Sequence, residues 1–119
     1  MSITAIQTIT IPVSDQERAL TFYRDVLNFE VRADNAFGDS RWLTVAPVGA
    51  ATEMVLHLPF PGTDPGWSKG VVLSTDDIDA TTEALRSAGV AVDGPESVGW
   101  GKQATFADPD GNGFVLTQA

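Results

Sequence analysis

The sequence predicts an α+β fold built from two β-α-β-β-β modules. Three observations support this prediction: short segments that alternate apolar and polar residues, two amphipathic helical segments, and a repeat of the same element order after about sixty residues. We expect a single domain over residues 1–119, with module one at about residues 3–60 and module two at about residues 68–118.

Module one begins with residues 5–13 (AIQTITIPV), where Thr alternates with Ile or Val as in a strand. Ser14 and Asp15 follow as candidate helix N-caps. Residues 16–27 (QERALTFYRDVL) place their apolar side chains on one helical face. We expect three extended segments after this helix, at residues 29–34, 41–49 and 53–60.

Module two repeats this order. A strand and a cap are expected in residues 69–77, and a helix in residues 78–89 that ends at Gly89 in the C′ position. Three segments follow: a short extended one at residues 90–94, a strand with a tight turn at residues 102–112, and a last strand at residues 113–118. Matching stretches of the two modules are ITIPVSD with VVLSTDD, WLTVA with QATFA, and MVLH with FVLT.

Charge and composition exclude several classes of function. The net charge of −9 opposes binding to nucleic acid, which needs a basic surface. No apolar run is long enough for a membrane span, and the absence of cysteine excludes disulfides and thiolate metal sites. The first fifteen residues show no signal-peptide pattern, so we expect a cytoplasmic protein.

Two motifs carry a family resemblance. They are D-x-x-R-A-L-x-F-Y-R-D-V-L-x-F, from Asp15 to Phe29, and D-P-D-G-N at residues 108–112 with an apolar strand behind it. With the paired modules, they resemble the glyoxalase / bleomycin-resistance / extradiol dioxygenase (vicinal oxygen chelate) superfamily. The resemblance implies a curled mixed sheet, in which each module forms a half-barrel with its helix on the convex side and the ligand site on the concave side. It also implies a homodimer.

The resemblance further places metal ligands on the first and last strand of each module. The first-strand ligand lies seven residues before the capping Asp, and the last-strand ligand lies in the middle of its strand. The matching positions here are Thr8, Val55, Gly70 and Val115. None of these side chains suits a divalent cation, so we expect no metal and no other cofactor. A shift of one residue would bring Gln7 into place, but it would also turn Ile9 and Ile11 toward the cavity.

Successive side chains of a strand point to opposite faces of the sheet, so these four positions predict which other side chains line the concave face. The lining mixes hydroxyl, amide, imidazole, carboxyl and indole groups, which suits a medium-sized organic ligand with scattered hydrogen-bonding groups. In module one the predicted side chains are Thr8, Thr10, Trp42, Thr44, Glu53, Val55 and His57. In module two they are Val72, Ser74, Gln103, Thr105, Val115 and Thr117, beside Gly70.

His57 is the only histidine, and histidine is the residue type that exchanges protons near neutral pH. One interpretation makes it a general base or a hydrogen-bond donor to a bound ligand. The other makes it a polar side chain at the mouth of the barrel or at a dimer seam. General-base catalysis also needs groups that polarise the substrate, and Gln103, Thr105 and Trp42 are the available donors.

Trp67 and Trp100 lie in glycine-rich loops ahead of predicted strands. Because an exposed indole is costly, we expect each to cover a ligand, an end of the barrel or a dimer interface. Aromatic walls with acidic rims would suit a flat cationic ligand. The candidate rim residues are Asp34, Asp39, Glu53, Asp64 and Glu96. Asp76 and Asp77, in contrast, are interpreted as acids that open a helix.

Three functions are therefore weighed. The leading one is metal-independent binding of a small aromatic or amphipathic molecule, as in the drug-sequestering branch of the superfamily. The second is a metal-free isomerase, epimerase or lyase that uses His57 as its acid/base. The third is a metal-dependent lyase or dioxygenase, which requires the shifted register. The small molecule is the expected partner, together with a second copy of the chain.

Overall fold

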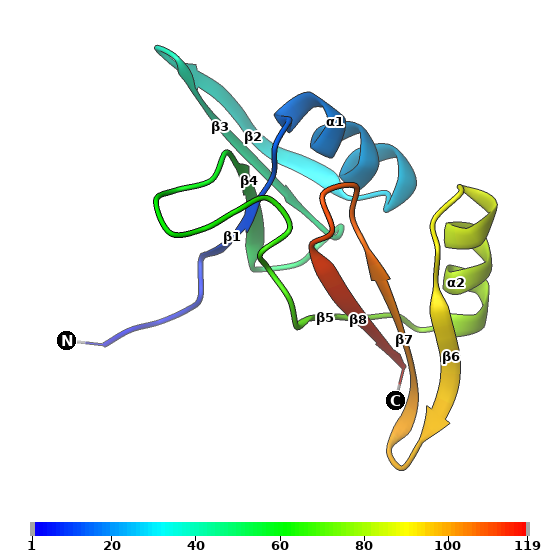
Figure 1. Ribbon diagram of the computed structural model, residues 1–119. Helices are drawn as coiled ribbons and strands as arrows, with labels where there is room; N and C mark the ends of the chain where they lie inside the picture. Colours follow the sequence, from blue (N-terminus) through cyan, green and yellow to red (C-terminus); the bar gives the residue numbers. More distant parts are fainter. Residues whose placement is uncertain (1, 119) are drawn as a thin grey trace. The chain divides into compact units, whose positions relative to one another are not determined.

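The computed structural model describes residues 2–118 and divides the chain into two compact units at Pro65 and Gly66 (Figure 1). Unit 1 contains β1 (Thr8–Pro12), α1 (Gln16–Thr21), a π-helical turn η1 (Phe22–Val26), β2 (Glu30–Phe37), β3 (Ser40–Ala46) and β4 (Glu53–His57). Unit 2 contains β5 (Val71–Ser74), α2 (Ile78–Ser87), β6 (Asp93–Val98), β7 (Gly101–Ala107) and β8 (Gly113–Gln118). The α+β class and the repeated β-α-β-β-β order are confirmed.

Each unit forms one four-stranded mixed sheet. The strand order is β1-β4-β3-β2 in unit 1 and β5-β8-β7-β6 in unit 2, so the topology is the same. In both, the first and last strands pair in parallel and the remaining pairs are antiparallel. The register repeats as well. The central row is Thr10–Val55–Thr44 in unit 1 and Val72–Val115–Thr105 in unit 2.

Both helices begin at an aspartate cap. Asp15 Oδ1 accepts a hydrogen bond from the backbone N–H of Arg18 at 3.1 Å, and Asp77 Oδ1 accepts one from Ala80 at 3.0 Å. These side chains satisfy helix-end donors that have no partner within the helix. The caps are therefore Asp15 rather than Ser14, and Asp77 rather than Asp76. Gly89 follows α2 with φ +89°, as expected for the C′ position.

The first helix differs from its prediction in the second half. Residues 16–27 were predicted as one regular helix, but η1 replaces the last turns. The N–H of Leu27 donates to the carbonyl of Phe22, five residues back, at 3.1 Å. Asn28 then takes a left-handed conformation, φ 59°, and ends the segment. Apolar periodicity does not distinguish these two hydrogen-bond patterns over so short a stretch.

Each sheet buries one face under its own helix (Figure 1). In unit 1 this core face carries Ile11, Leu43, Val45, Met54 and Leu56, all buried. In unit 2 it carries Ala104, Phe106, Phe114 and Leu116, packed with Ile78 and Leu85 of α2. The rings of Phe106 and Phe114 stack with their centroids 5.4 Å apart. The predicted apolar face is thus the core face, which leaves the other face of each sheet for other contacts.

The D-P-D-G-N motif forms a self-bonded turn between β7 and β8. The Asp108 carboxylate accepts hydrogen bonds from the backbone of Asp110 and from both the backbone and the side chain of Asn112, at 2.8–3.0 Å. Asn112 Oδ1 in turn accepts from the backbone of Ser68 at 3.1 Å. A Cβ at Gly66 would lie 2.2 Å from the carbonyl oxygen of Asp110, so glycine is required there. This motif therefore has a structural role.

Neither helix has the length and apolar content that crossing a membrane requires, among the residues that the structure describes.

Candidate functional site

Strand pairing places the predicted lining of unit 1 on one face of its sheet. Thr8 pairs with Glu53, Thr10 with Val55, and Thr44 also pairs with Val55. Directly paired residues point to the same side of a sheet, and residues two apart along a strand do so too. Trp42 and His57 therefore join the set by alternation. We call this surface the polar face of unit 1: Thr8, Thr10, Trp42, Thr44, Glu53, Val55 and His57.

The centre of this face is buried, whereas its margins are accessible. Thr44 and Val55 expose 0% and 1% of their surface, but Thr10 is exposed and Trp42 is 41% exposed. The Thr44 hydroxyl has no hydrogen-bond partner among the described residues. A buried hydroxyl without a partner costs free energy.

His57 is held in one orientation at the end of β4. Its Nδ1 lies 2.7 Å from the carbonyl oxygen of Leu58, and its ring stacks on Phe60 with centroids 4.6 Å apart. Because a carbonyl only accepts, Nδ1 carries the proton, and in the neutral ring Nε2 is then the acceptor. The half-buried imidazole therefore presents a basic nitrogen in a fixed orientation.

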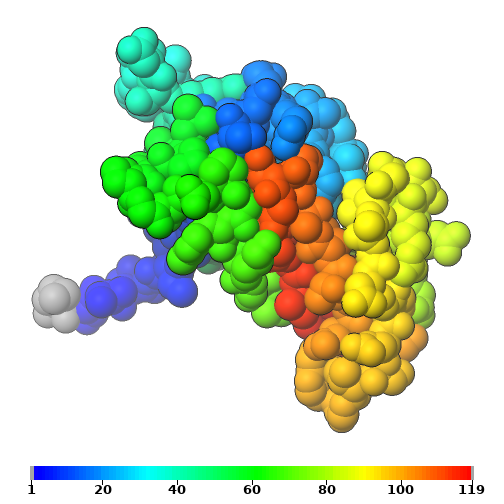
Figure 2. Space-filling model, viewed as in Figure 1, coloured from blue at the N-terminus to red at the C-terminus, as the bar shows by residue number. Residues whose placement is uncertain are grey.

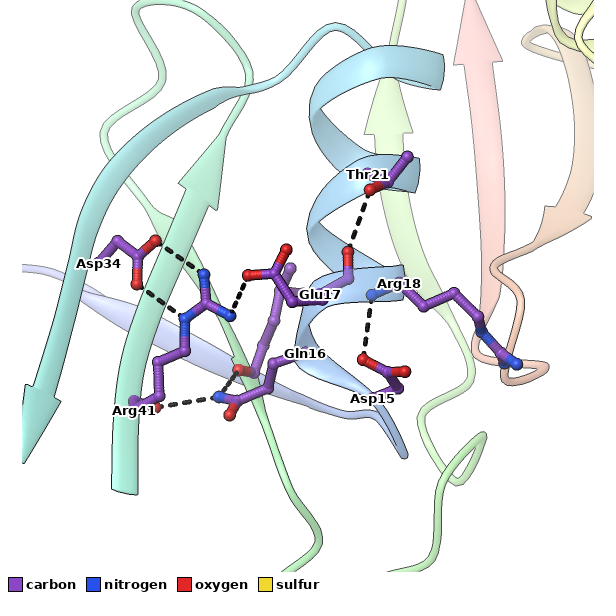
Figure 3. A network of polar contacts seen from close by, with 8 residues as sticks. Asp15, Gln16, Glu17, Arg18, Thr21, Asp34 and Arg41 are labelled. Atoms are coloured by element: carbon purple, nitrogen blue, oxygen red, sulfur yellow. Dashed lines mark hydrogen bonds and ion pairs between the residues drawn. The ribbon is translucent and has the colours of Figure 1, made fainter. Parts of the chain in front are cut away.

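Two of the predicted acidic rim residues are already engaged by arginines. Arg41 donates from Nε and Nη2 to the two carboxylate oxygens of Asp34, both at 2.8 Å, and from Nη1 to Glu17 at 2.6 Å (Figure 3). These bonds lower the pKa of Asp34 and raise that of Arg41. Glu53 lies 3.7 Å from Nη1 of Arg32. These acids are therefore poor partners for a cationic ligand.

The same network ties α1 to the sheet. Gln16 Nε2 donates to the carbonyl oxygens of Arg41 and Leu56, each at 2.9 Å (Figure 3). The start of α1 is thereby fixed to β3 and β4, on the strands that carry Trp42 and His57. Glu17, Asp34 and Arg41 likewise link α1, β2 and β3.

Unit 2 has a corresponding polar face that is open. Val72, Val115 and Thr105 form its central row, and Gln103 pairs with Thr117 beside it. Val72 is 58% exposed, Thr105 is exposed and Val115 is half-buried, whereas the matching Thr44 and Val55 of unit 1 are buried. Gly70 precedes β5 and has a φ of +86°. We define the polar face of unit 2 as Val72, Ser74, Gln103, Thr105, Val115 and Thr117.

A pocket of about 330 Å³ lies where β5 and β8 end and the β6–β7 turn begins. Of its residues, Trp100 is a predicted ligand contact, and Ser74 and Thr117 are predicted side chains of the concave face. Asp76 was not predicted as a pocket residue, because it is adjacent to Asp77 and both acids were assigned to the start of the helix. The hydrogen bond from Ala80 to Asp77 shows that Asp77 is the cap and Asp76 is not. The full lining is Ser74, Thr75, Asp76, Trp100, Thr117 and Gln118.

A second, more open hollow of about 480 Å³ lies beside the start of β6. Of the predicted residues it contains only Thr105. Its lining is Ala91, Val92, Asp93, Thr105, Phe106 and Ala107. The single carboxylate and hydroxyl make it a less specific surface than the pocket beside Trp100.

All three tryptophans are partly exposed to solvent. Trp42, Trp67 and Trp100 are 41%, 64% and 57% exposed. Trp100 borders the pocket described above, whereas Trp67 precedes β5 and borders neither hollow.

The four positions that the family resemblance assigns to metal ligands offer no suitable donor set. Thr8, Val55, Gly70 and Val115 supply one hydroxyl, two isopropyl groups and a hydrogen, which do not fit a divalent cation. Within residues 2–118, no group of three His, Cys, Asp or Glu side chains is arranged to hold a metal ion.

Comparison with known proteins now defines the family. The model of the Glyoxalase/Bleomycin resistance protein/Dioxygenase superfamily matches residues 5–116. The chain belongs to this superfamily. TnmS3, an antibiotic binding protein from Streptomyces sp. CB03234, is 48% identical, with a TM-score of 0.95 over 99% of this chain and 98% of that one.

Two further proteins extend the comparison. A superfamily protein from Sphaerobacter thermophilus DSM 20745 is 40% identical, with a TM-score of 0.91 over 98% of both chains. The uncharacterised protein YetH of Bacillus subtilis (strain 168) is 33% identical over 95% of this chain and 97% of its own length. These matches span both units, so the resemblance is not limited to one repeat.

Proposed function

We propose that this superfamily member binds a small aromatic or amphipathic molecule without a metal ion and returns it unchanged. The observation that carries the proposal is the chemistry of the two polar faces. Their central rows, Thr10–Val55–Thr44 and Val72–Val115–Thr105, combine hydroxyls with aliphatic surface. Such rows bind the apolar body and scattered polar groups of an organic ligand. The similarity to an antibiotic binding protein supports the same ligand class.

The proposed contact residues differ in how far their side chains are exposed to solvent. Thr8, Thr10, Trp42, His57, Trp67, Trp100, Gln103, Thr105 and Val115 are exposed or half-buried. Thr44 and Val55 are buried, so a ligand reaches them only when the residues that cover them move. The unpartnered Thr44 hydroxyl would then gain a hydrogen bond, which favours binding.

Tryptophan fluorescence with a panel of aromatic antibiotics that includes bleomycin and daunorubicin tests this proposal. Thr10→Ala and Thr105→Ala should each weaken binding by about fivefold, the equivalent of about 1 kcal/mol for one hydrogen bond. Thr21→Ala is the matched control, because the Thr21 hydroxyl bonds only within α1, to the carbonyl of Glu17. No binding by any panel member, or equal loss in the Thr21 variant, would contradict the proposal.

Elemental analysis tests the metal-independent part. The protein is incubated with zinc, manganese and iron salts and then dialysed. We expect less than one tenth of an equivalent of metal to remain, about the background of such measurements, because the four family positions lack donors. Near-stoichiometric metal would instead favour the metal-dependent lyase or dioxygenase.

The second candidate is a metal-free isomerase, epimerase or lyase with His57 as acid/base. The fixed imidazole favours it, because the Nδ1–Leu58 bond leaves Nε2 to accept a proton. In such an enzyme His57→Ala should lower turnover by about 10²–10⁴-fold. In a sequestering protein the same variant should keep most of its affinity.

We also propose that the protein is a cytoplasmic homodimer. The exposed indoles of Trp42, Trp67 and Trp100 support a partner surface. Light scattering at micromolar concentration should give twice the mass of one chain. A monomer under these conditions would contradict this part of the proposal.

A further inference from the structure

The pocket of unit 2 contains a free carboxylate beside an exposed aromatic ring. Its volume of about 330 Å³ suits a single substituted ring or a short side chain of a larger ligand. The β6–β7 turn that forms one wall lies at the surface and is visible in yellow-orange in Figure 2. Ser74, Asp76 and Trp100 of its lining are exposed, so the pocket is accessible from solvent.

Among the described residues that line this pocket, Asp76 alone has a charged side chain. Asp77 caps α2, so the Asp76 carboxylate is not needed for that purpose. Lys102 pairs with Asp79 at 3.0 Å, and among residues 2–118 no Lys or Arg forms an ion pair with Asp76. This contrasts with Asp34, whose carboxylate is occupied by Arg41.

The other polar residues of the wall are held in place. Gln118 Oε1 accepts a hydrogen bond from the backbone N–H of Ile78 at 2.6 Å. The hydroxyl of Thr75 bonds to that of Thr81 at 2.8 Å. These bonds fix the wall around Asp76 before any ligand arrives, which lowers the entropy cost of binding.

Trp100 supplies the aromatic surface of the pocket. Its indole is 57% exposed on the β6–β7 turn. An indole face attracts a cation and stacks on an aromatic ring, and a carboxylate nearby supplies the counter-charge. The net charge of −9 also favours cations over anions.

We propose that this pocket binds an organic ammonium group, with Asp76 as its charge partner and Trp100 as its aromatic platform. The inference rests on the proposed function, because it identifies which chemical part of the ligand unit 2 recognises. The ligand class is a protonated amine carried on a ring or on a short chain.

Benzylamine and benzyl alcohol are suitable probes, because they have nearly the same shape and only the amine is charged at pH 7. Amide NMR shifts during titration report both the affinity and the place of binding. Benzylamine should shift the signals of residues 74–76, 100 and 117–118, and benzyl alcohol should bind more weakly. Raising the salt concentration should weaken benzylamine binding.

Three variants test the roles of the residues. Asp76→Asn should weaken benzylamine binding by about threefold to fivefold, as expected for an exposed ion pair. Trp100→Leu should weaken it by a similar factor through loss of the cation–π contact. Glu83→Gln removes one negative charge from an exposed position of α2 outside the pocket and should change nothing. Equal binding of the two probes, or equal loss in the Glu83 and Asp76 variants, would overturn the inference.

The antibiotic panel separates this inference from the proposed function. If panel members bind but benzylamine does not, the ammonium site is wrong and the proposed function stands. If benzylamine binds in an Asp76-dependent manner but no panel member does, the site is correct and the proposed function is wrong.

Discussion

Units 1 and 2 share their topology, strand register and helix caps, yet their polar faces differ. Val55 and Thr44 at the centre of the unit 1 face are buried, whereas the matching Val115 and Thr105 of unit 2 are half-buried and exposed. The acids Asp34 and Glu53 of unit 1 pair with arginines, but among residues 2–118 no Lys or Arg forms an ion pair with Asp76. The repeated backbone thus supports two different surfaces. Ligand recognition depends on the side chains that each unit adds to the shared frame.

The largest difference between the two units is expected in the free energy of unfolding when the matched valines, Val55 and Val115, are shortened to alanine. Val55→Ala removes two methyl groups from a buried site and should lower the free energy of unfolding by about 2 kcal/mol. Val115→Ala, at a half-buried site, should cost about 1 kcal/mol. Urea unfolding of the two variants measures both costs. Equal losses would show that the two rows are equally buried in solution.

The helix caps should behave alike in the two units. Asp15→Ala and Asp77→Ala each leave one helix-end N–H without its partner and should each destabilise the protein by about 1 kcal/mol. Thermal unfolding measures the effect, with Asp76→Ala as the neighbouring control. A larger loss in this control would contradict the assignment of the α2 cap.

Replacing the matched threonines, Thr44 and Thr105, by valine should have different effects on the free energy of unfolding. Thr44→Val replaces an unpartnered buried hydroxyl and should stabilise the protein by about 1 kcal/mol. Thr105 is exposed, so Thr105→Val should change the free energy of unfolding by less than about 0.5 kcal/mol. Chemical denaturation compares the two variants. A clear destabilisation by Thr44→Val would mean that the hydroxyl has a partner, such as a buried water molecule.

The smallest expected effect concerns acid stability. Hydrogen bonds from Arg41 hold the pKa of Asp34 below its ordinary value of 3.8. Its contribution is therefore present above pH 3.8 and is lost as the pH falls through the lower folded-state pKa. The stability difference between the parent protein and Asp34→Asn should shrink between pH 7 and pH 2. Asp64→Asn, an exposed acid, is the control, and a pH-independent difference at Asp34 would contradict the pairing.

Much of the fold could be predicted from the sequence because it depends on local patterns. Apolar alternation at Ile9, Ile11 and Val13 identifies a strand and its core face, and the Asp caps mark both helix starts. The repeat then fixes the correspondence of Val55 with Val115, which the strand register confirms. The family resemblance is confirmed as well.

The details of the site could not be predicted in the same way, because they depend on the surroundings of each strand. Alternation places Thr44 and Thr105 on equivalent faces, but it does not show that one is buried and the other open. The engagement of Asp34 by Arg41 depends on pairing between strands. Asp76 and Asp77 look alike in sequence, and only the backbone of α2 determines which of them is the cap.

The central claim is that the protein binds a small molecule and does not transform it. The most direct measurement is to saturate the protein with daunorubicin or another binding member of the antibiotic panel, denature it, and analyse the released compound by chromatography and mass spectrometry. We predict stoichiometric recovery with unchanged mass and retention time, also for His57→Ala. A product of different mass or retention time, formed only when His57 is present, would contradict the claim and favour the enzyme.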